Sequence, residues 1–304
     1  MELVFLGTAS AIPSKFRNHS SIALKAFGEV ILFDCGEGTQ RQLTIAKISP
    51  MKINKIFISH YHGDHILGLP GLLQSMDFRG RETPIEIYGP KGLNQLKNAI
   101  LNLGYSSINF PIILHEINEN EEHKIFENEE YYVNCIKTSH NISNISYSIT
   151  EKKKPRFLRE KAIELGVKVG PDFGKLHKGI EIEINGKIIK PEEVLGPPRK
   201  GIKISYSGDT SYDENLIKLA ENSDILIHEG TYEEKDRTKA NKSFHSTAKD
   251  AAKLAKNSNV NQLIITHLST RYSDQKNIKQ EATSIFKNTT IAYDFLTIDL
   301  TKLK

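Results

Sequence analysis

Two successive series of short runs rich in β-branched residues, separated by amphipathic stretches, organise this chain of 304 residues. Runs of this kind are typical of buried strands, and the intervening stretches have the period of surface helices. Strands that alternate with helices in two series predict a layered α/β fold. We expect strands at 3–6, 21–24, 30–33, 56–58, 85–88, 131–136 and 145–149, then at 202–206, 225–227, 263–266 and 291–298. We expect helices at 67–76, 91–101, 215–221 and 247–256.

The segment 151–200 interrupts this pattern and carries the excess positive charge. It contains 13 basic and eight acidic residues, a balance of +5, whereas the rest of the chain has a balance of −1. Glycine and proline punctuate it, and Asn185-Gly186 between two short apolar runs is a strong signal for a β-hairpin. We therefore expect an inserted basic arm in a single-domain chain. Its charge suits a polyanionic partner such as nucleic acid, although a solvated loop would have the same composition.

The sharpest signal is the stretch 59–65 (SHYHGDH), directly after the expected strand at 56–58. Within six residues it places three imidazoles and a carboxylate: His60, His62, Asp64 and His65. Alternate side chains of an extended chain point the same way, so His60 and His62 share a face. Neutral imidazole and carboxylate groups suit zinc or manganese. The stretch therefore predicts a site for one divalent ion and the beginning of a second.

Three other candidate ligands, His140, Asp209 and His267, each follow an apolar strand. In layered α/β folds, functional sites gather at the edge where strands end. Any one of the three could be a polar residue that merely ends a strand. Together they supply the missing ligands for two metal ions.

The composition and the apolar pattern argue against several other classes of protein. No run of 18 apolar residues suggests a membrane span, and the first residues (MELVFLG) read as a strand without the layout of a signal peptide. Two cysteines cannot build a disulfide framework or a four-cysteine zinc site. We therefore expect a cytoplasmic protein that does not bind a membrane.

The ligand pattern and five further motifs resemble the ribonuclease Z family of the metallo-β-lactamase superfamily. The pattern is HxHxDH at 60–65 followed by His140, Asp209 and His267. The motifs resemble the family's PxKxRN loop, FDCGEGTQ stretch, HEAT motif, HST motif and the glycine–proline pair of its arm, and they lie at 13–18, 33–40, 228–231, 245–247 and 170–171. Gly230 takes the place of the usual alanine in the HEAT motif.

This resemblance implies a fold, an activity and partners. The fold would be an αββα sandwich of two similar halves, with metals at one edge and a protruding, flexible arm at 151–200 that binds tRNA. The activity would be that of a zinc-dependent endoribonuclease that removes the 3′ trailer from precursor tRNA. It would leave a 3′-hydroxyl on the tRNA and a 5′-phosphate on the trailer. The chain has the length of the short form of this family, which is a homodimer.

The resemblance also implies a set of ligands for two zinc ions per subunit, with manganese as a possible substitute. The first ion would be held by His60, His62, His140 and Asp209. The second would be held by Asp64, His65, His267 and Asp209, so that Asp209 bridges the two.

Catalytic and substrate-binding roles follow from the same resemblance. Asp64 would act as the base toward the attacking water. His245, oriented by Glu229, would be the acid that assists the leaving oxygen. Lys15 and Arg17 would lie near the tRNA 3′ terminus, and Arg271 could bind a phosphate close to the last ligand.

Three alternatives remain open at the level of sequence. A metal-dependent phosphodiesterase for small esters or other RNA would use the same ligands but would not need a basic arm. A lactonase or thioesterase would need no leaving-group acid, so the HEAT-like and HST-like motifs argue against it. An RNA-binding module with a degenerate site would not need the complete set of seven ligands.

Overall fold

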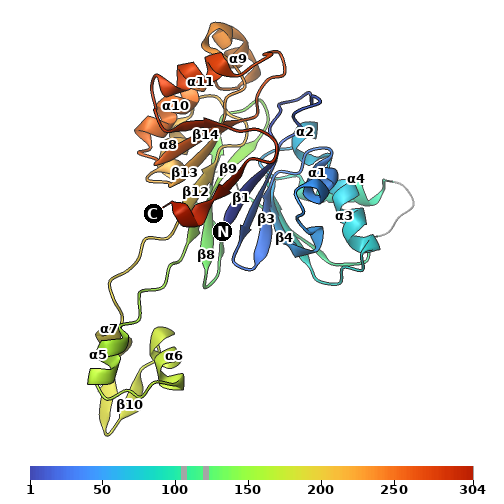
Figure 1. Cartoon of the computed structure of the whole chain (residues 1–304). Coiled ribbons are helices and arrows are strands. Elements are labelled where there is room, and N and C mark those ends of the chain that lie inside the picture. The colour runs from blue at the N-terminus through green and yellow to red at the C-terminus, as the bar shows by residue number, and fades with distance from the viewer. Residues whose placement is uncertain (104–107, 119–122, 304) are drawn as a thin grey trace. The chain divides into compact units, whose positions relative to one another are not determined.

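The computed structural model describes residues 1–103, 108–118 and 123–303. The chain divides into two compact units, one made of Met1–Thr150 and Ile202–Lys304 and the other of Glu151–Gly201. The first unit contains two mixed seven-stranded sheets with helices beside them (Figure 1). The layered α/β fold expected from the alternation of strands and helices is therefore confirmed. Among the described residues, none of the helices has the length and apolar character needed to cross a bilayer.

The first sheet comes from the N-terminal half of the chain, with one C-terminal strand added at its edge. Its order is β16-β1-β2-β3-β4-β5-β6, in which β3 to β6 are parallel neighbours and the rest are antiparallel. Its strands are β16 (Thr297–Asp299), β1 (Glu2–Gly7), β2 (Ser21–Ala26), β3 (Glu29–Phe33), β4 (Ile53–Phe57), β5 (Ile85–Gly89) and β6 (Ile112–Glu116).

The second sheet repeats this plan with the C-terminal half. Its order is β15-β14-β13-β12-β9-β8-β7, in which β12 to β15 are parallel and β9 runs antiparallel to β12. Its strands are β15 (Thr289–Ile291), β14 (Gln262–Thr266), β13 (Ile225–Glu229), β12 (Lys203–Tyr206), β9 (Asn144–Glu151), β8 (Tyr131–Thr138) and β7 (His123–Glu127).

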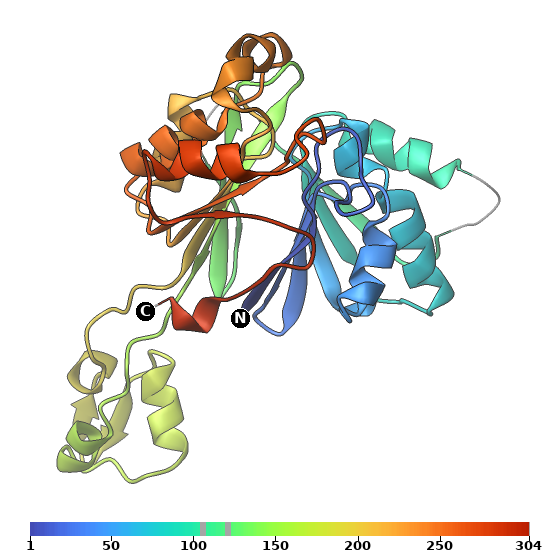
Figure 2. The same ribbon diagram turned by 45° about the horizontal axis from the view of Figure 1, so that its top comes forward.

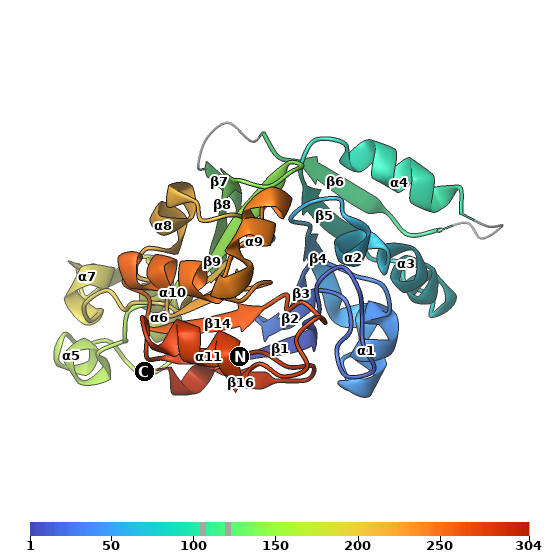
Figure 3. The same ribbon diagram turned by 90° about the horizontal axis from the view of Figure 1, so that it is seen from above.

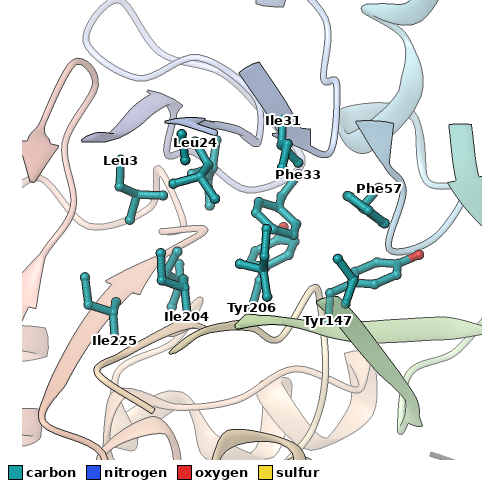
Figure 4. Packing of buried hydrophobic residues seen from close by; sticks show 14 of the residues in the cluster. Leu3, Leu24, Ile31, Phe33, Phe57, Tyr147, Ile204, Tyr206 and Ile225 are labelled. Carbon is teal, nitrogen blue, oxygen red and sulfur yellow. The ribbon is translucent and has the colours of Figure 1, made fainter. Parts of the chain in front are cut away.

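An apolar layer fills the space between the two sheets. In Figure 4, Ile31 and Phe33 of β3 lie opposite Ile204 and Tyr206 of β12. Alternate residues of a strand point to opposite faces, so Leu32 of the same strand packs instead in the outer cluster under the helices. Both faces of each sheet are therefore covered, which explains why the strands read as nearly continuous apolar runs.

Helices cover the outer face of each sheet (Figures 2 and 3). Those beside the first sheet are α1 (Thr39–Ile45), α2 (Gly63–Ile66), α3 (Leu69–Phe78) and α4 (Leu93–Leu101). Those of the second half are α8 (Glu214–Ala220), α9 (Arg237–Ser243), α10 (Ala248–Asn257) and α11 (Lys276–Thr283). Helix α10 begins where its sequence predicts, because the Thr247 hydroxyl and the Asp250 carboxylate form a reciprocal capping box.

The second unit has an apolar core of its own, formed by six buried residues with Leu176 and Val194 among them. Its elements are α5 (Arg159–Glu164), α6 (Pro171–His177), β10 (Ile182–Ile184), β11 (Lys187–Ile189) and α7 (Pro191–Val194). The hairpin predicted at Asn185-Gly186 is confirmed, since β10 pairs with β11 and both turn residues have positive φ.

The prediction of one strand at 291–298 is wrong. The chain forms β15 in the second sheet, crosses over, and forms β16 in the first sheet. Phe295 has a φ of 68° at this crossing, and such a backbone cannot continue a strand. Two edge strands, β6 and β7, were not predicted because their residues are half-buried or exposed and their apolar pattern is weak.

Candidate active site

The seven expected metal ligands converge at the edge of the sandwich where strands of both sheets end. His60 and His62 follow β4, and Asp64 and His65 lie in the short helix α2. His140, Asp209 and His267 follow β8, β12 and β14 of the second sheet. The site is therefore assembled from both halves of the first unit.

The first group contains His60, His62, His140 and Asp209, whose ligand atoms all lie within 4.8 Å of one another. The Nδ1 atom of His62 lies 3.0 Å from Nε2 of His60 and 3.3 Å from Nε2 of His140. The Nε2 atom of His60 lies 3.7 Å from Oδ2 of Asp209. Three imidazoles and one carboxylate thus face a common point.

The second group contains Asp64, His65 and His267. The Nε2 atom of His267 lies 3.3 Å from Oδ2 of Asp64 and 3.3 Å from Nε2 of His65. Oδ2 of Asp209 lies 3.4 Å from Nε2 of His65 and 3.2 Å from Nε2 of His267. Asp209 therefore contacts both groups, as a bridging ligand must.

The outer nitrogen of each of four imidazoles is held by the protein. His140 donates from Nδ1 to the backbone carbonyl of Phe244 at 2.9 Å, and His65 donates from Nδ1 to Oδ2 of Asp34 at 2.7 Å. Since a carbonyl and a carboxylate can only accept, these bonds leave an unprotonated Nε2 atom on His140 and on neutral His65. That nitrogen points into the cluster.

Two hydroxyl groups anchor the remaining pair. Ser59 donates to Asp34 at 2.8 Å, so its oxygen accepts from Nδ1 of His60 at 2.9 Å. In the same way Thr231 donates to Glu229 at 2.7 Å and accepts from Nδ1 of His267 at 2.9 Å. Outer partners of this kind fix the orientation of metal-binding histidines.

These residues fit a divalent metal centre. Burial lowers the pKa of His60, His62 and His140, which favours the neutral form that binds metal. Oδ1 of Asp209 is buried without a hydrogen-bond partner among the described residues. Converging lone pairs and an unpaired buried carboxylate oxygen are costly unless a cation lies among them.

The carboxylates of the site favour their charged forms. Burial opposes ionisation of Asp209, but His267 and His65 hold its pKa well below the usual range.

The protonation of His65 is affected by the same contacts. Burial opposes a charge on His65, whereas Asp209 and Asp34 raise its pKa well above the usual range. His65 must therefore lose a proton before its Nε2 atom can bind a cation.

A histidine–carboxylate pair lies beside the second group. Nδ1 of His245 donates to Oε1 of Glu229 at 2.7 Å, and the buried Glu229 also accepts from the backbone N–H groups of Thr210 and Thr231. Burial opposes the charge on His245, but Glu229 overcomes it and raises the pKa of His245 to about 9. An imidazole in this setting is protonated at neutral pH and can give up a proton.

A pocket of about 380 Å³ opens over these groups and is lined by Asp64, Asp209, His245 and Arg271, among others. The guanidinium of Arg271 lies 4.7 Å from the centroid of the Tyr232 ring, and its Nε donates to Ser269. The expected phosphate contact is thus part of the wall of the pocket.

The other two expected substrate contacts, Lys15 and Arg17, lie away from this pocket, on the loop formed by residues 13–18. Arg17 donates to the hydroxyl of Thr8 at 2.6 Å and to the carbonyl of Ala292 at 2.7 Å, so its head group is engaged by the protein. Lys15 is exposed, and its ammonium lies 4.7 Å from the centroid of the Phe16 ring. The structure does not bring either residue into the pocket over the seven ligands.

Three supporting residues were not predicted as parts of the site: Asp34, Ser59 and Thr231. Asp34 and the ligand His267 both have a left-handed backbone, with φ of 58° and 56°. Strain of this kind costs about 1–3 kcal/mol for each residue and is often retained at functional sites. The position of Asp34 directly after a strand was the available signal in the sequence.

The departure at Gly230 has a structural reason. A Cβ atom at this position would lie 2.4 Å from Cγ2 of Ile265, a branch next to the backbone of β14. An alanine at position 230 would therefore require Ile265 to move. With glycine at this position, the adjacent Glu229 still contacts His245, Thr210 and Thr231.

Comparison with solved structures places this architecture in a known class. A metallo-β-lactamase-fold protein of Bacillus subtilis superposes with a TM-score of 0.70 at 19% identity, over 98% of both chains. Human tRNase Z, short form, superposes with a TM-score of 0.74 at 30% identity, over 99% of both chains. The fold and the edge site define a metallo-β-lactamase-fold enzyme of the αββα type.

Comparison with curated sequences gives the particular family. Ribonuclease Z of Methanothermobacter thermautotrophicus is 53% identical over 99% of this chain and 97% of its own length. Ribonuclease Z of Methanocaldococcus jannaschii is 50% identical over 91% of this chain and 88% of its own length. The chain belongs to the ribonuclease Z family, and its residues 1–158 belong also to the family described as "Anti-Pycsar protein Apyc1".

Proposed function

We propose that this chain is a zinc-dependent endoribonuclease that cleaves the 3′ trailer from precursor tRNA. Cleavage leaves a 3′-hydroxyl on the tRNA and a 5′-phosphate on the trailer. The observation that carries this proposal is that His245, hydrogen-bonded to the buried Glu229, lines a pocket together with four of the seven expected metal ligands. Family membership supports the same activity.

Two zinc ions per subunit would be held by the two groups of ligands, with manganese as a possible substitute. When bound, such ions would offset the charge of the phosphodiester and lower the pKa of water toward about 7. His60, His62, His140 and Asp209 would hold one ion, and Asp64, His65, His267 and Asp209 the other.

Asp64 would be the base toward the attacking water. Its carboxylate lines the pocket, and Oδ2 accepts from Nε2 of His267 when that ring is protonated. Burial opposes its ionisation, but His267 and His65 hold the pKa of Asp64 well below the usual range. The carboxylate is therefore ionised at neutral pH, as a base must be.

His245 would be the acid. The leaving group is the ribose 3′-oxygen, which is a poor leaving group as an alkoxide. A protonated His245 in the wall of the pocket could give this oxygen a proton, while Glu229 stabilises the positive charge before the transfer. The Nδ1 atom is committed to Glu229, so the proton would come from Nε2.

Substrate binding would use charges outside the metal centre. Arg271 would contact a phosphate at the pocket, and Lys15 would contact the RNA end from its exposed loop. Arg17 would contribute by shaping that loop through its bonds to Thr8 and Ala292. The basic arm, residues 151–200, would grip the folded body of tRNA.

The chain would act in the cytoplasm, as its composition favours, and as a homodimer, as its resemblance to the short form of the family implies. Light scattering during gel filtration at micromolar concentration would test the assembly. A mass near 69 kDa, about twice that of a 34.3 kDa chain, is expected. A mass of one chain across the concentration range would contradict it.

The deciding experiment is incubation with a 3′-extended precursor tRNA and mapping of both product ends. We expect one cut at the trailer junction, a 3′-hydroxyl and a 5′-phosphate. A chelator should abolish cleavage, and zinc or manganese should restore it. Cleavage of a small phosphodiester without cleavage of precursor tRNA would instead identify a phosphodiesterase for small esters.

A further inference from the structure

A second pocket, of about 350 Å³, adjoins the catalytic one, and Ser269 and Thr270 line both. Because these two residues follow the ligand His267 closely, the second pocket lies next to the place where the scissile bond would be held. Its volume is in the range of sites that bind small organic groups. None of the proposed catalytic groups lines it.

Three aromatic side chains line this second pocket. Tyr272 is tied by its hydroxyl to Asp236 and to the backbone N–H of Glu233, whereas Phe16 and Tyr293, which come from distant parts of the chain, are exposed. Phe16 is 75% exposed and Tyr293 is 57% exposed. An isolated exposed apolar residue is ordinary, but two large exposed rings on the walls of one pocket offer stacking surfaces to a planar ligand. Because the ammonium of Lys15 lies over one face of Phe16, a ligand would stack on the other face of that ring.

Hydrogen bonds join the two chain segments that carry Phe16 and Tyr293. Arg17, next to Phe16, donates to the carbonyl of Ala292, next to Tyr293, at 2.7 Å. The backbone N–H of Asn18 donates to Asp294 at 2.7 Å. The backbone segments that carry the two rings are thus joined before any ligand binds, which lowers the entropy cost of binding.

The polar groups on the walls suit an uncharged, planar ligand. Ser14, Ser273 and Gln275 offer hydrogen-bonding side chains, and no carboxylate occurs among the described residues that line the pocket. Arg17, the only charged residue among the described residues that line the pocket, is held by Thr8 and Ala292 through its Nη1 atom. Lys15 does not line the pocket, and its ammonium lies 4.7 Å from the centroid of the Phe16 ring.

We propose that this pocket binds the base of the nucleotide beside the scissile phosphodiester, with Phe16 and Tyr293 as its stacking surfaces. The inference rests on the proposed function. Every base has a face that can stack, so the pocket would position RNA with at most a modest preference for its sequence. The base belongs to the last nucleotide of the tRNA or to the first nucleotide of the trailer.

Two abasic substrates distinguish these sources. One precursor tRNA lacks the base on the tRNA side of the cleavage site, and the other lacks it on the trailer side. For one of them, we expect kcat/KM of the parent enzyme to fall about 5- to 150-fold. With Tyr293→Ala, the intact substrate should lose a similar factor, and removal of that base should cost little more.

Tyr293→Phe keeps the ring and should behave like the parent, and Phe16→Ala should resemble Tyr293→Ala. Phe78→Ala is the matched control, because Phe78 is 83% exposed but does not line the pocket. If removal of either base lowered kcat/KM by the same factor in Tyr293→Ala as in the parent enzyme, the inference would be overturned. A parent enzyme that does not cleave precursor tRNA would refute the proposed function instead.

Discussion

Four of the five imidazole rings of the metal centre, those of His60, His65, His140 and His267, divide two tasks between their nitrogens. One nitrogen is held by Asp34, Ser59, Thr231 or the carbonyl of Phe244, and the other faces the cluster. Because these anchors are groups of the protein itself, the fold determines how the four rings are oriented. Substitutions of ligands and of the acid pair should therefore have separable effects.

His245→Ala should retain its metal and lose about 10²–10⁴-fold in turnover, since only the proton donor is removed. Asp64→Ala should be nearly inactive and should also lose metal, because that carboxylate is both ligand and base. Metal content by elemental analysis, measured beside the rate, separates the two. His115→Ala is a control, as its partner is Glu86 and not the site. Loss of metal from His245→Ala would show that His245 is a ligand instead.

The dependence of kcat/KM on pH should report the protonation of His245. In the unfolded chain an imidazole loses its proton near pH 6.5, whereas the pKa of His245 in the fold is about 9. The acid is therefore present through neutral pH, and kcat/KM should fall only above about pH 9. Glu229→Gln removes the charge that raises this pKa, so the fall should begin at lower pH. An unchanged alkaline limb in Glu229→Gln would contradict the assignment.

At the scale of elements, the arm is the feature most open to deletion. Its two ends lie together, because Thr150 pairs with Lys203 and the carbonyl of Glu151 approaches Gly201 closely. The arm also has its own apolar core, so its loss should not expose the interior of the sandwich. A short linker can therefore replace it.

Replacing residues 155–198 by a Gly/Ser linker should leave hydrolysis of a small phosphodiester intact while weakening binding of precursor tRNA. Each lost phosphate contact should reduce the log–log salt slope by about 0.9. A variant with Lys152, Lys153, Lys154 and Arg156 changed to Glu tests charge without deletion. Binding by filter retention across salt concentrations is the measurement. If both variants process precursor tRNA like the parent, the arm is a solvated loop.

The sequence predicted elements well where the apolar pattern is strong. The inner strands β3, β4, β12, β13 and β14 are buried on both faces, so their β-branched runs are unmistakable. The edge strands β6 and β7 lack that pattern. The apolar run at 291–298 concealed a crossing between sheets, which no local property of the run announces.

The candidate site could be predicted in part for the same reason. Its seven ligands follow strands or occupy one dense motif, and the structure brings all seven together. The anchoring bonds of Asp34 to His65 and of Thr231 to His267 depend on contacts across 31 and 36 positions of the chain. Such pairings are set by tertiary structure, and a local pattern does not contain them.

At the scale of the whole molecule, the metal centre connects the two sheets. The first sheet supplies His60, His62, Asp64 and His65 through its loops, and the second supplies His140, Asp209 and His267. Bound ions would therefore stabilise the folded state, by about 2.7 kcal/mol for one site at a hundred times its Kd. Removing them with a chelator should lower Tm in a scanning calorimeter, and zinc should restore it. An unchanged Tm after complete metal removal would contradict this coupling.

The order of these ligands along the chain has a consequence for synthesis on the ribosome. His65 and His267 meet in the fold although 202 positions separate them. At a translation rate of about 5–20 residues per second, the last ligand is made roughly 10–40 s after the first group. The strands β1 to β6 thus leave the ribosome with only part of a centre. A nascent chain therefore acquires its complete set of seven ligands only after His267 has been made.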